Sequence, residues 1–518
     1  MSGGAGSSRH LKRWGGALVV MTLLVGASGA SKGEAVHWNQ FRGPNGSGVV
    51  DAFRPPVEID AQRRAWKISI PDGQSSPVLW GDRIFVTGVE NDRLVAVCLN
   101  AKSGDILWKR RAPKTPLEKV HKTSSPAASS PCADAERVFA YFGSYGLLCY
   151  DHAGELVWEK PLPTPKSLYG MATSPIVHGD RVILALDDDA NLRGSKLSRS
   201  RLIALNKQTG EVVWETARPY NRSGWSTPVI WNHGGGVEVV VLGSGRAYGY
   251  DVATGGEQWF VGGFSRETIA TPVIGDGKVH LSASRRGGWG DDKIDPEPFW
   301  KAALSFDRNG DGRVGRDEIS KDFTLPFRPE LPPGHPGFGM PLPDDPKRRK
   351  ERQLGLFGWR DTNKDGFWTR EEFVKDMVVG RGQPSLAAVR PGGQGDVTES
   401  HVAWNLRSGI PEIPSPVFHD GRLYLVRAGG VLSCVDAEDG AVIYRERIGA
   451  AGQYSASPVM ANDRLYLVSA RGQITVVKTG DVFEIEQQTE LGSPVAATPA
   501  MDAKTFYVRT DEGLMAFR

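Results

Sequence analysis

The chain has 518 residues, more than a single compact core usually accommodates. We therefore expect either several domains or a repeat architecture. Its 63 basic and 60 acidic residues nearly cancel, so no basic surface for nucleic acid is implied and we expect no nucleic-acid partner. Glycine (63 residues) and tryptophan (15) are both abundant. Regular glycine turns with regular aromatic residues are typical of propellers.

The N-terminus has the layout of a secretory signal peptide. Arg9, Lys12 and Arg13 precede the apolar run 17–26, and small residues follow at 27–30. The apolar run is too short for a permanent anchor, and no later stretch is long enough to span a bilayer. No cysteine lies near the predicted cleavage site, so we expect no lipoprotein anchor. The sequence therefore predicts an exported protein, periplasmic or extracellular, with a signal peptide at 1–30.

A four-strand unit recurs along the chain. Residues 415–444, SPVFHDGRLYLVRAGGVLSCVDAEDGAVIY, divide into four short strands separated by tight turns rich in Gly and Asp. Similar units open with Ser-Pro or Thr-Pro, at Pro77, Pro131, Pro175, Pro228, Pro272, Pro416, Pro458 and Pro499. Six of the seven spacings lie between 41 and 54 residues, and the seventh is 144. The repeat predicts eight antiparallel sheet blades, one of which carries an insertion.

A second series marks the blade ends, and it is out of phase with the first. Its members are Trp66, Trp108, Trp158, Trp214, Trp259, Trp404 and, less typically, Tyr444 and Ile485. Trp66 precedes the first opening, whereas only three strands follow Pro499. The strand around residues 65–70 must therefore supply the outer strand of the last blade. The predicted fold class is all-β, an eight-bladed β-propeller of four-stranded blades closed without exposed edges.

These repeats support a family resemblance. The (Asp/Asn)-x-x-x-Gly turns in LNAKSG, LNKQTG, DVATG and DAEDG, each ahead of an aromatic outer strand, resemble the eight-bladed pyrroloquinoline-quinone (PQQ) type propeller. WNQFRGPNGSG at 38–48 and residues 395–417 resemble exported bacterial PQQ-binding-like repeat proteins. The resemblance implies the fold and makes PQQ a candidate cofactor, but it leaves the biochemical role open.

The long spacing predicts the domain organisation. Blade five breaks near Arg285 and resumes at SLAAVRP, so the insertion lies between its second and third strands. The predicted parts are a signal peptide (1–30), an N-terminal extension (31–63), a first propeller part (64–285), an insert (286–383) and a second propeller part (384–518).

Two windows in the insert, 307–318 and 361–372, fit the calcium-loop pattern D-x-[DN]-x-[DN]-G-x5-E. Calcium takes six to eight oxygen ligands, which this spacing folds inward. The predicted ligands of the first loop are Asp307, Asn309, Asp311, the Arg313 carbonyl, a water at Gly315 and Glu318. Those of the second are Asp361, Asn363, Asp365, the Phe367 carbonyl, Thr369 and Glu372.

The sequence around these loops resembles a paired EF-hand. Helices are predicted before the loops, at 297–306 and 347–359, and after them, at 317–323 and 370–378. Val314 and Trp368 occupy the positions where paired loops pack together. The alternatives are charged Asp-Gly turns or a dockerin-type loop, which commonly ends in Asp and lacks an entering helix. Three arginines flank the first loop, so we expect a Kd of about 10⁻⁵ to 10⁻³ M.

Two functions from different classes fit this sequence. One is a non-catalytic scaffold that binds calcium through the insert and a protein or small molecule through its loop-rich face. This face is the side of the propeller where the loops leading into the Ser/Thr-Pro openings are expected to lie. The other is a PQQ-dependent quinoprotein dehydrogenase. Such enzymes typically carry an adjacent Cys-Cys pair, and this chain has none. We assign no catalytic residue. An outer-membrane assembly propeller is a more distant analogy.

Three smaller features complete the sequence-based predictions. Cys98, Cys149 and Cys434 share one repeat position, so we expect the cysteines to be buried apolar residues rather than disulfides. The acidic run 187–189 is predicted to be a solvated turn, with a cation site as the alternative. The basic run 347–352 is predicted to be the exposed face of a helix.

Overall fold

The computed structural model describes Met1 and residues 37–167, 169–189, 199–219, 221–265, 267–284, 296–326, 332–334, 338–340, 342–375, 384–449 and 452–518. Residues 1–36 form one unit and residues 37–518 a second. The predicted signal peptide lies outside the described residues.

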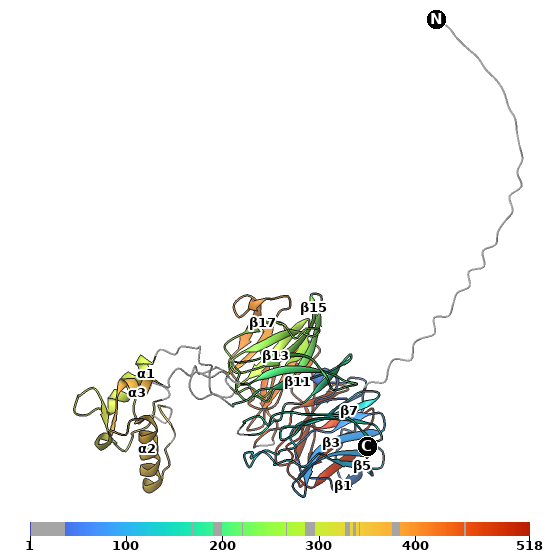
Figure 1. The fold of residues 1–518 in the computed structure, drawn as a ribbon, viewed down its shortest axis with the longest axis horizontal. Helices are drawn as coiled ribbons and strands as arrows, with labels where there is room; N and C mark the ends of the chain where they lie inside the picture. Colours follow the sequence, from blue (N-terminus) through green and yellow to red (C-terminus); the bar gives the residue numbers. More distant parts are fainter. Residues whose placement is uncertain are drawn as a thin grey trace, which may run out of the picture. The chain divides into compact units, whose positions relative to one another are not determined.

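Eight blades of four antiparallel strands follow one another in the second unit, and a short fifth strand extends the sheet of the fourth blade (Figure 1). The strands of the first four blades are β2 (Val78–Trp80), β3 (Arg83–Glu90), β4 (Arg93–Asn100), β5 (Ile106–Arg111); β6 (Cys132–Ala133), β7 (Arg137–Phe142), β8 (Gly146–Asp151), β9 (Leu156–Pro161); β10 (Ile176–His178), β11 (Arg181–Leu186), β12 (Arg201–Asn206), β13 (Val212–Ala217); β14 (Val229–His233), β15 (Gly236–Leu242), β16 (Ala247–Asp251), β17 (Glu257–Val261).

The last four blades contain β18 (Val273–Gly275), β19 (Lys278–Ala283), β22 (Ser385–Val389), β24 (Val402–Leu406); β25 (Val417–His419), β26 (Arg422–Arg427), β27 (Val431–Asp436), β28 (Val442–Arg447); β29 (Val459–Ala461), β30 (Arg464–Val468), β31 (Gln473–Lys478), β32 (Ile485–Glu490); β33 (Ala500–Met501), β34 (Phe506–Thr510), β35 (Gly513–Phe517), β1 (Arg64–Ile68).

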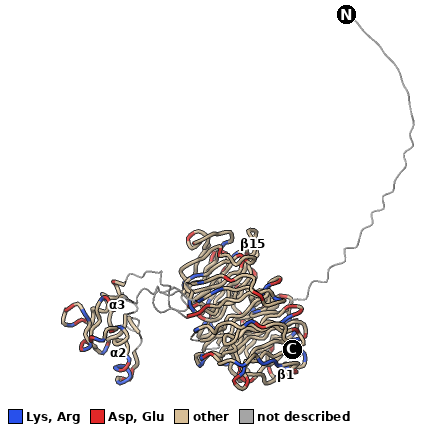
Figure 2. The backbone as a smooth tube through the Cα atoms, viewed as in Figure 1, with Lys and Arg blue, Asp and Glu red and all other residues tan. Residues whose placement is uncertain are grey.

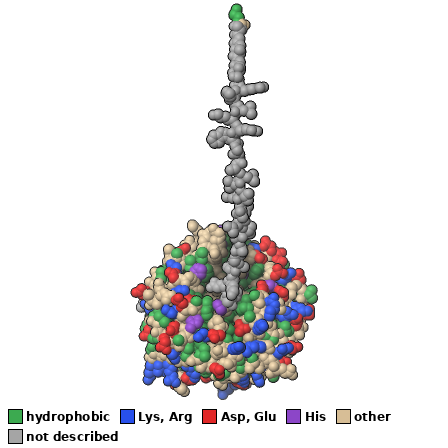
Figure 3. Space-filling model, turned by 90° about the vertical axis from the view of Figure 1, so that its right-hand side faces the viewer, with side chains coloured by type: hydrophobic (Ala, Val, Ile, Leu, Met, Phe, Trp, Pro, Cys, Tyr) green, Lys and Arg blue, Asp and Glu red, His purple; other side chains and the backbone are tan. Residues whose placement is uncertain are grey.

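The last blade closes the ring in the predicted way. β1, near the start of the described chain, pairs antiparallel with β35 and becomes the outer strand of the eighth sheet. The all-β, eight-bladed propeller is therefore confirmed. Acidic and basic residues are interspersed along the chain and over the face shown (Figures 2 and 3). None of the described helices combines the length and apolarity that a membrane span needs.

Tryptophans hold neighbouring blades together. The indole nitrogen of Trp158 donates to the Lys207 carbonyl at 2.9 Å, and a Cβ atom at Gly210 would lie 2.7 Å from the same ring. The glycine of each Asx-Gly turn thus leaves room for the tryptophan of the preceding blade. The same donation to the following blade recurs at Trp66, Trp108, Trp214 and Trp404.

The fourth blade departs from this pattern. The Trp259 indole nitrogen donates to the Glu238 carboxylate, at 2.7 Å, within its own sheet. In the fifth blade, the connection between the third and fourth strands, β22 and β24, is longer than in the other blades. Part of this connection, β23 (Gly395–Asp396), pairs parallel with β17. This extra strand covers the edge of the fourth blade, so no Asx-Gly turn lies there to receive the indole.

The fifth blade is interrupted between its second and third strands, where β19 and β22 pair directly with Ala283 opposite Ser385. The intervening residues contain α1 (Glu297–Ala303), η2 (Leu304–Phe306), β20 (Val314–Gly315), η3 (Arg316–Glu318), α2 (Pro346–Arg360), β21 (Phe367–Trp368) and α3 (Arg370–Lys375). These elements enclose an aromatic core of their own, which includes Phe306, Phe323, Phe357, Trp368 and Phe373.

One predicted helix of the insert is wrong. Residues 317–323 form no α-helix; the chain makes the 3₁₀ turn η3 and then continues irregularly. The Gln353 side chain of α2 donates to the carbonyls of Ser320, Lys321 and Phe323, at 2.9 to 3.1 Å. These carbonyls are thereby satisfied without helical hydrogen bonds. The predicted exposed face at 347–352 is confirmed, since all but the half-buried Arg349 are exposed.

Residues 37–54, here called the axial segment, cross the inner strands of the ring. The carbonyl of Trp38 accepts from Leu79 of β2, and that of Asn39 accepts from Ala133 of β6. The Asn45 side chain exchanges two hydrogen bonds with the Ile230 backbone, at 2.7 and 2.8 Å. Further contacts with Pro416, Met460 and Ala503 reach the sixth, seventh and eighth blades.

Candidate functional site

A ring of hydroxyl groups surrounds the propeller axis. At seven of the eight blade openings, the Ser or Thr before the proline donates its backbone N–H to the hydroxyl of the Ser or Thr in the next blade, at 2.8 to 3.1 Å. Seven such bonds link neighbouring blades, and the bond from Thr498 to Ser76 joins the last blade to the first. The repeated Ser/Thr-Pro dipeptide therefore fastens the ring at its centre.

A cavity of about 220 Å³ lies at this ring, and all eight blades contribute to its wall. Its lining combines ring hydroxyls with alanines and larger apolar side chains. None of the described residues that line it carries a charged side chain. Phe41 of the axial segment forms part of the wall, so this segment closes the cavity on one side.

Two aromatic rings form one wall of the cavity. Tyr169 and Trp225 meet edge to face, with ring centroids 5.5 Å apart. The Trp225 indole nitrogen donates to the Gly170 carbonyl at 2.8 Å, and the Ser124 hydroxyl donates to the Tyr169 carbonyl at 2.6 Å. The wall is thus held by the connections that precede the second, third and fourth blades.

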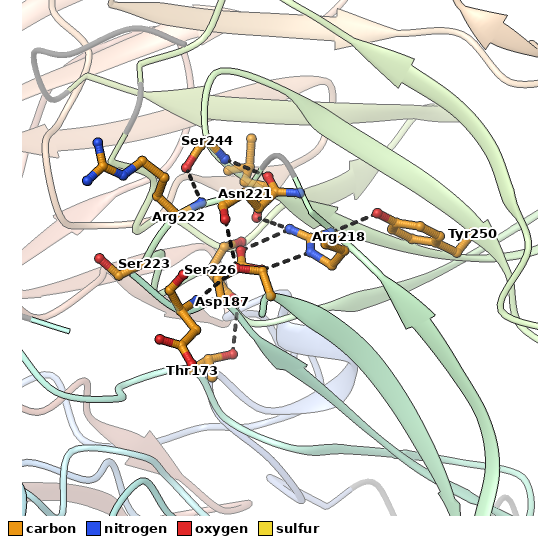
Figure 4. Close-up of polar contacts among 12 residues, drawn as sticks. Thr173, Asp187, Arg218, Asn221, Arg222, Ser223, Ser226, Ser244 and Tyr250 are labelled. Atoms are coloured by element: carbon orange, nitrogen blue, oxygen red, sulfur yellow. Dashed lines mark hydrogen bonds and ion pairs between the residues drawn. The ribbon is translucent and has the colours of Figure 1, made fainter. Parts of the chain in front are cut away.

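A buried ion pair supports the same sector (Figure 4). Arg218 donates to both carboxylate oxygens of Asp187, at 2.9 and 3.0 Å, and to the Tyr250 hydroxyl at 2.9 Å. Burial lowers the pKa of Arg218, but the Asp187 carboxylate together with Tyr250 and Tyr248 outweighs burial, and the net effect raises the pKa. The bidentate pair orients Arg218 within the third blade, and the hydrogen bond to Tyr250 of β16 ties it to the fourth blade.

The prediction of a solvated acidic turn at 187–189 is wrong. Asp187 and Asp188 are only 3% and 5% exposed. Asp188 pairs with Arg199 at 2.7 Å, and Asp189 accepts from the Ser223 hydroxyl at 2.8 Å. Each carboxylate has its own protein donor, so the run serves to anchor loops. Asn191 lies outside the described residues.

Burial raises the pKa of the Glu118 carboxyl to about 7. Both of its oxygens are buried and have no hydrogen-bond partner among the described residues. Glu118 belongs to the same connection as Thr123 and Ser124, which line the cavity. It does not itself line the cavity.

The cavity lining does not fit PQQ. PQQ is a planar quinone with three carboxylates, and burying unpaired carboxylates is costly without cationic partners. The described lining offers hydroxyl and aromatic groups but no guanidinium or ammonium group. The cysteines provide no alternative contact, since all four are free and buried, as predicted. Burial raises the pKa of Cys98 and Cys149 to about 12, which leaves the thiols protonated.

The first acidic loop of the insert is folded around its own backbone. Glu318 accepts from the backbone N–H groups of Arg308, Asn309 and Gly315, at 2.6 to 3.1 Å. The two Asp307 carboxylate oxygens accept from Gly310 and Gly312, at 2.7 and 2.9 Å. The carboxylates of the first and last positions of this loop thus point inward.

The second loop repeats this arrangement. Glu372 accepts from Thr362 and Asn363, both at 3.0 Å, and Asp361 accepts from Gly366 at 3.2 Å. The side chains of Asn363 and Asp365 each accept from the backbone two residues later, as Asn309 and Asp311 do.

The two loops are joined by a short antiparallel pair. Val314 lies opposite Trp368 in the β20–β21 ladder, and both side chains are fully buried, as predicted. Among the described residues, no group of three or more His, Cys, Asp or Glu side chains is arranged to hold a metal ion. The calcium ligands remain a prediction.

The axial cavity was not predicted from the sequence. The Ser/Thr-Pro openings mark the repeat in the sequence, and their hydroxyl groups are the signal from which a common inner ring could be predicted. The stretch at 38–48 carries the family resemblance, and in the structure it also supplies Phe41 and crosses the axis. Tyr169 and Trp225 lie in irregular connections and had no repeat signal.

The fold and the axial cavity define a closed eight-bladed propeller with one small central site. The sequence matches the profile of the PQQ_2 family, described as outer membrane protein assembly factor BamB, over residues 46–302 and 385–518. The protein belongs to this family. The unmatched stretch, 303–384, contains both acidic loops.

Other relatives are more distant. The sequence is 24% identical over 194 residues to polyvinylalcohol dehydrogenase from Pseudomonas sp, a match covering 35% of this chain but only 28% of that protein. Quinohemoprotein alcohol dehydrogenase from Comamonas testosteroni shares the fold with a TM-score of 0.51 and 11% identity, over 92% of this chain and 77% of that one. A europium-containing methanol dehydrogenase gives 0.50 and 12%, over 92% and 89%. At these identities the solved structures support the fold alone.

Proposed function

We propose that this protein is an exported, calcium-binding propeller that acts as a non-catalytic binding scaffold. The observation that carries the proposal is the axial cavity, whose described lining has no charged side chain. A quinoprotein dehydrogenase needs a base beside its substrate and partners for an anionic cofactor. Hydroxyl and aromatic groups suit an uncharged ligand or a partner side chain instead.

The insert is proposed to be an EF-hand pair that binds calcium, with the predicted boundaries 286–383. The support is the inward-pointing carboxylates of both loops and the β20–β21 pair that couples them. In the structure these carboxylates accept hydrogen bonds from backbone N–H groups of their own loops. Calcium would be held by the residues predicted above, and a structural role is the simplest one.

Export and partner binding are further parts of the proposal. The predicted signal peptide supports export. The family description as an assembly factor supports interaction with another protein. The connections that lead into the Ser/Thr-Pro dipeptides line the axial cavity, so a protein partner would be recognised on that face.

A PQQ-dependent dehydrogenase is the second candidate. The similarity to polyvinylalcohol dehydrogenase favours it. If PQQ were bound, it would supply two-electron oxidation of an alcohol. The residues of this chain would then have to provide cationic partners for the carboxylates of PQQ. The described lining of the axial cavity provides none.

A dye-linked oxidation assay separates the two candidates. The mature protein, incubated with PQQ and calcium, is offered short alcohols, polyvinyl alcohol and sugars. The scaffold proposal predicts no dye reduction above that of the protein without PQQ, while calorimetry with calcium finds two sites. PQQ-dependent dye reduction would establish the dehydrogenase, and the absence of calcium uptake would remove calcium from the proposal.

A further inference from the structure

The axial segment carries a buried cation whose donors are only partly used. Arg42 is 0% exposed. Its Nη2 atom donates to the carbonyls of Ser47 and Pro416, at 3.3 and 2.5 Å. Its Nε and Nη1 atoms are buried, and neither has an acceptor in the part of the chain that the structure describes.

Two other arginines show how this protein usually buries a guanidinium group. Arg218, 2% exposed, is held by the Asp187 carboxylate and the Tyr250 hydroxyl. Arg509, also 2% exposed, donates through Nη1 and Nη2 to three carbonyls and the Ser75 hydroxyl. Arg42 has neither a carboxylate partner nor a comparable set of acceptors.

Two neighbours in the axial segment also have donors without an acceptor. The Trp38 indole nitrogen and the Gln40 side-chain nitrogen are also buried without an acceptor among the described residues. Trp38 is 1% and Gln40 3% exposed. Three residues at alternate positions of one short stretch therefore present N–H groups that no described residue satisfies.

Such a set requires a compensating group. Arginine keeps its charge in proteins, so Arg42 cannot escape the cost of burial by losing a proton. Burial lowers the pKa of Arg42 to about 9, with no nearby carboxylate to oppose it. A buried unpaired cation is destabilising unless an anion or further acceptors offset it. Buried donors without a protein acceptor call for an ordered water or ion.

We propose that Arg42 holds a small monovalent anion, of the size and charge of chloride, inside the axial segment. One guanidinium charge matches one anionic charge, and N–H groups are the donors that anions accept. Because Arg42 is fully buried, the anion is enclosed as the axial segment folds onto the inner strands. It then stabilises the folded state in proportion to its concentration.

The test is thermal unfolding of the mature protein at constant ionic strength, with sodium chloride replacing sodium gluconate stepwise. We expect the wild-type midpoint to rise with the logarithm of chloride concentration, and the midpoint of Arg42→Met to stay constant. Arg422→Met is the matched control, since Arg422 is in the same blade as Pro416 but pairs with Asp481 at 2.7 Å. It should keep the wild-type chloride response. Equal responses in wild type and Arg42→Met, or none in wild type, would overturn the proposal.

A second measurement does not depend on the folding of Arg42→Met. Crystals of the wild-type protein grown in sodium bromide should show an anomalous peak within hydrogen-bonding distance of Arg42 Nε or Nη1. A water molecule or a protein acceptor at that position, with no anomalous signal, would show that the charge is compensated without an anion.

Discussion

The propeller and the insert satisfy their polar groups in different ways. In the propeller, the tryptophans, the ring hydroxyls and the Arg218 side chain find partners in the neighbouring blade. In the insert, the acidic side chains of both loops accept from the N–H groups of their own loop. The propeller is held by contacts between repeats, whereas the insert is proposed to depend on calcium bound by its two acidic loops.

The largest effect is expected at the contact between blades. Trp158→Ala should lower the free energy of unfolding by about 3–5 kcal/mol, because it removes a buried indole and leaves a cavity beside Gly210. Trp359→Ala, on the insert, is the control; its side chain is 59% exposed, and the change should stay within about 0.5 kcal/mol. Urea unfolding measures both. Similar losses in the two variants would contradict the assigned role of the tryptophans.

Calcium removal should affect the insert alone. At calcium 100-fold above Kd, binding stabilises a folded domain by about 2.7 kcal/mol. We therefore expect chelation to increase proteolytic cleavage within 296–375 while the propeller stays intact. Glu372→Gln should weaken the calcium protection, and Glu371→Gln, an exposed neighbour, should keep it. Calcium-dependent melting of the propeller would break the comparison between the two regions.

Glu118 should give the propeller a pH dependence. Its folded-state pKa is about 7 and its ordinary value 4.5, so the folded state binds the proton more tightly. The associated stabilisation is present below about pH 4.5 and is lost as pH rises through about 7. Glu118→Gln should therefore melt at a higher temperature than wild type at pH 8 and at the same temperature at pH 4. Glu155→Gln, at an exposed position, should show no such difference.

The smallest expected effect concerns the first acidic loop. Arg313 lies 3.1 Å from the Asp311 carboxylate, so it would compete with a bound calcium ion for that group. Exposed ion pairs are weak, so Arg313→Gln should tighten calcium binding at this loop by no more than about fivefold. Calorimetry with Lys347→Gln as control measures the change. Weaker binding in Arg313→Gln would show that the arginine supports the loop.

Much of the propeller could be predicted from the sequence, because each blade repeats the same turn and strand chemistry. The spacing of the Ser/Thr-Pro dipeptides, the glycine turns and the tryptophans predicted the number of blades and the closure by β1. Trp259 broke the series because β23 occupies the place of the usual turn, which a local pattern does not reveal.

The features that single residues decide could not be predicted. The missing helix at 317–323 depends on Gln353, which lies 30 residues away from Phe323 in the sequence. The burial of the acidic run depends on Arg218 and Arg199, whose pairing is a tertiary contact. The axial cavity requires all eight blades to meet. Local periodicity in the sequence carries no information about contacts between residues that are far apart in the chain.

Equilibrium dialysis of the mature protein against PQQ at saturating calcium tests the central claim most directly. The uncharged lining of the axial cavity predicts no saturable binding up to millimolar protein. Tight binding of one PQQ per chain would contradict this account and make the protein a quinoprotein dehydrogenase candidate.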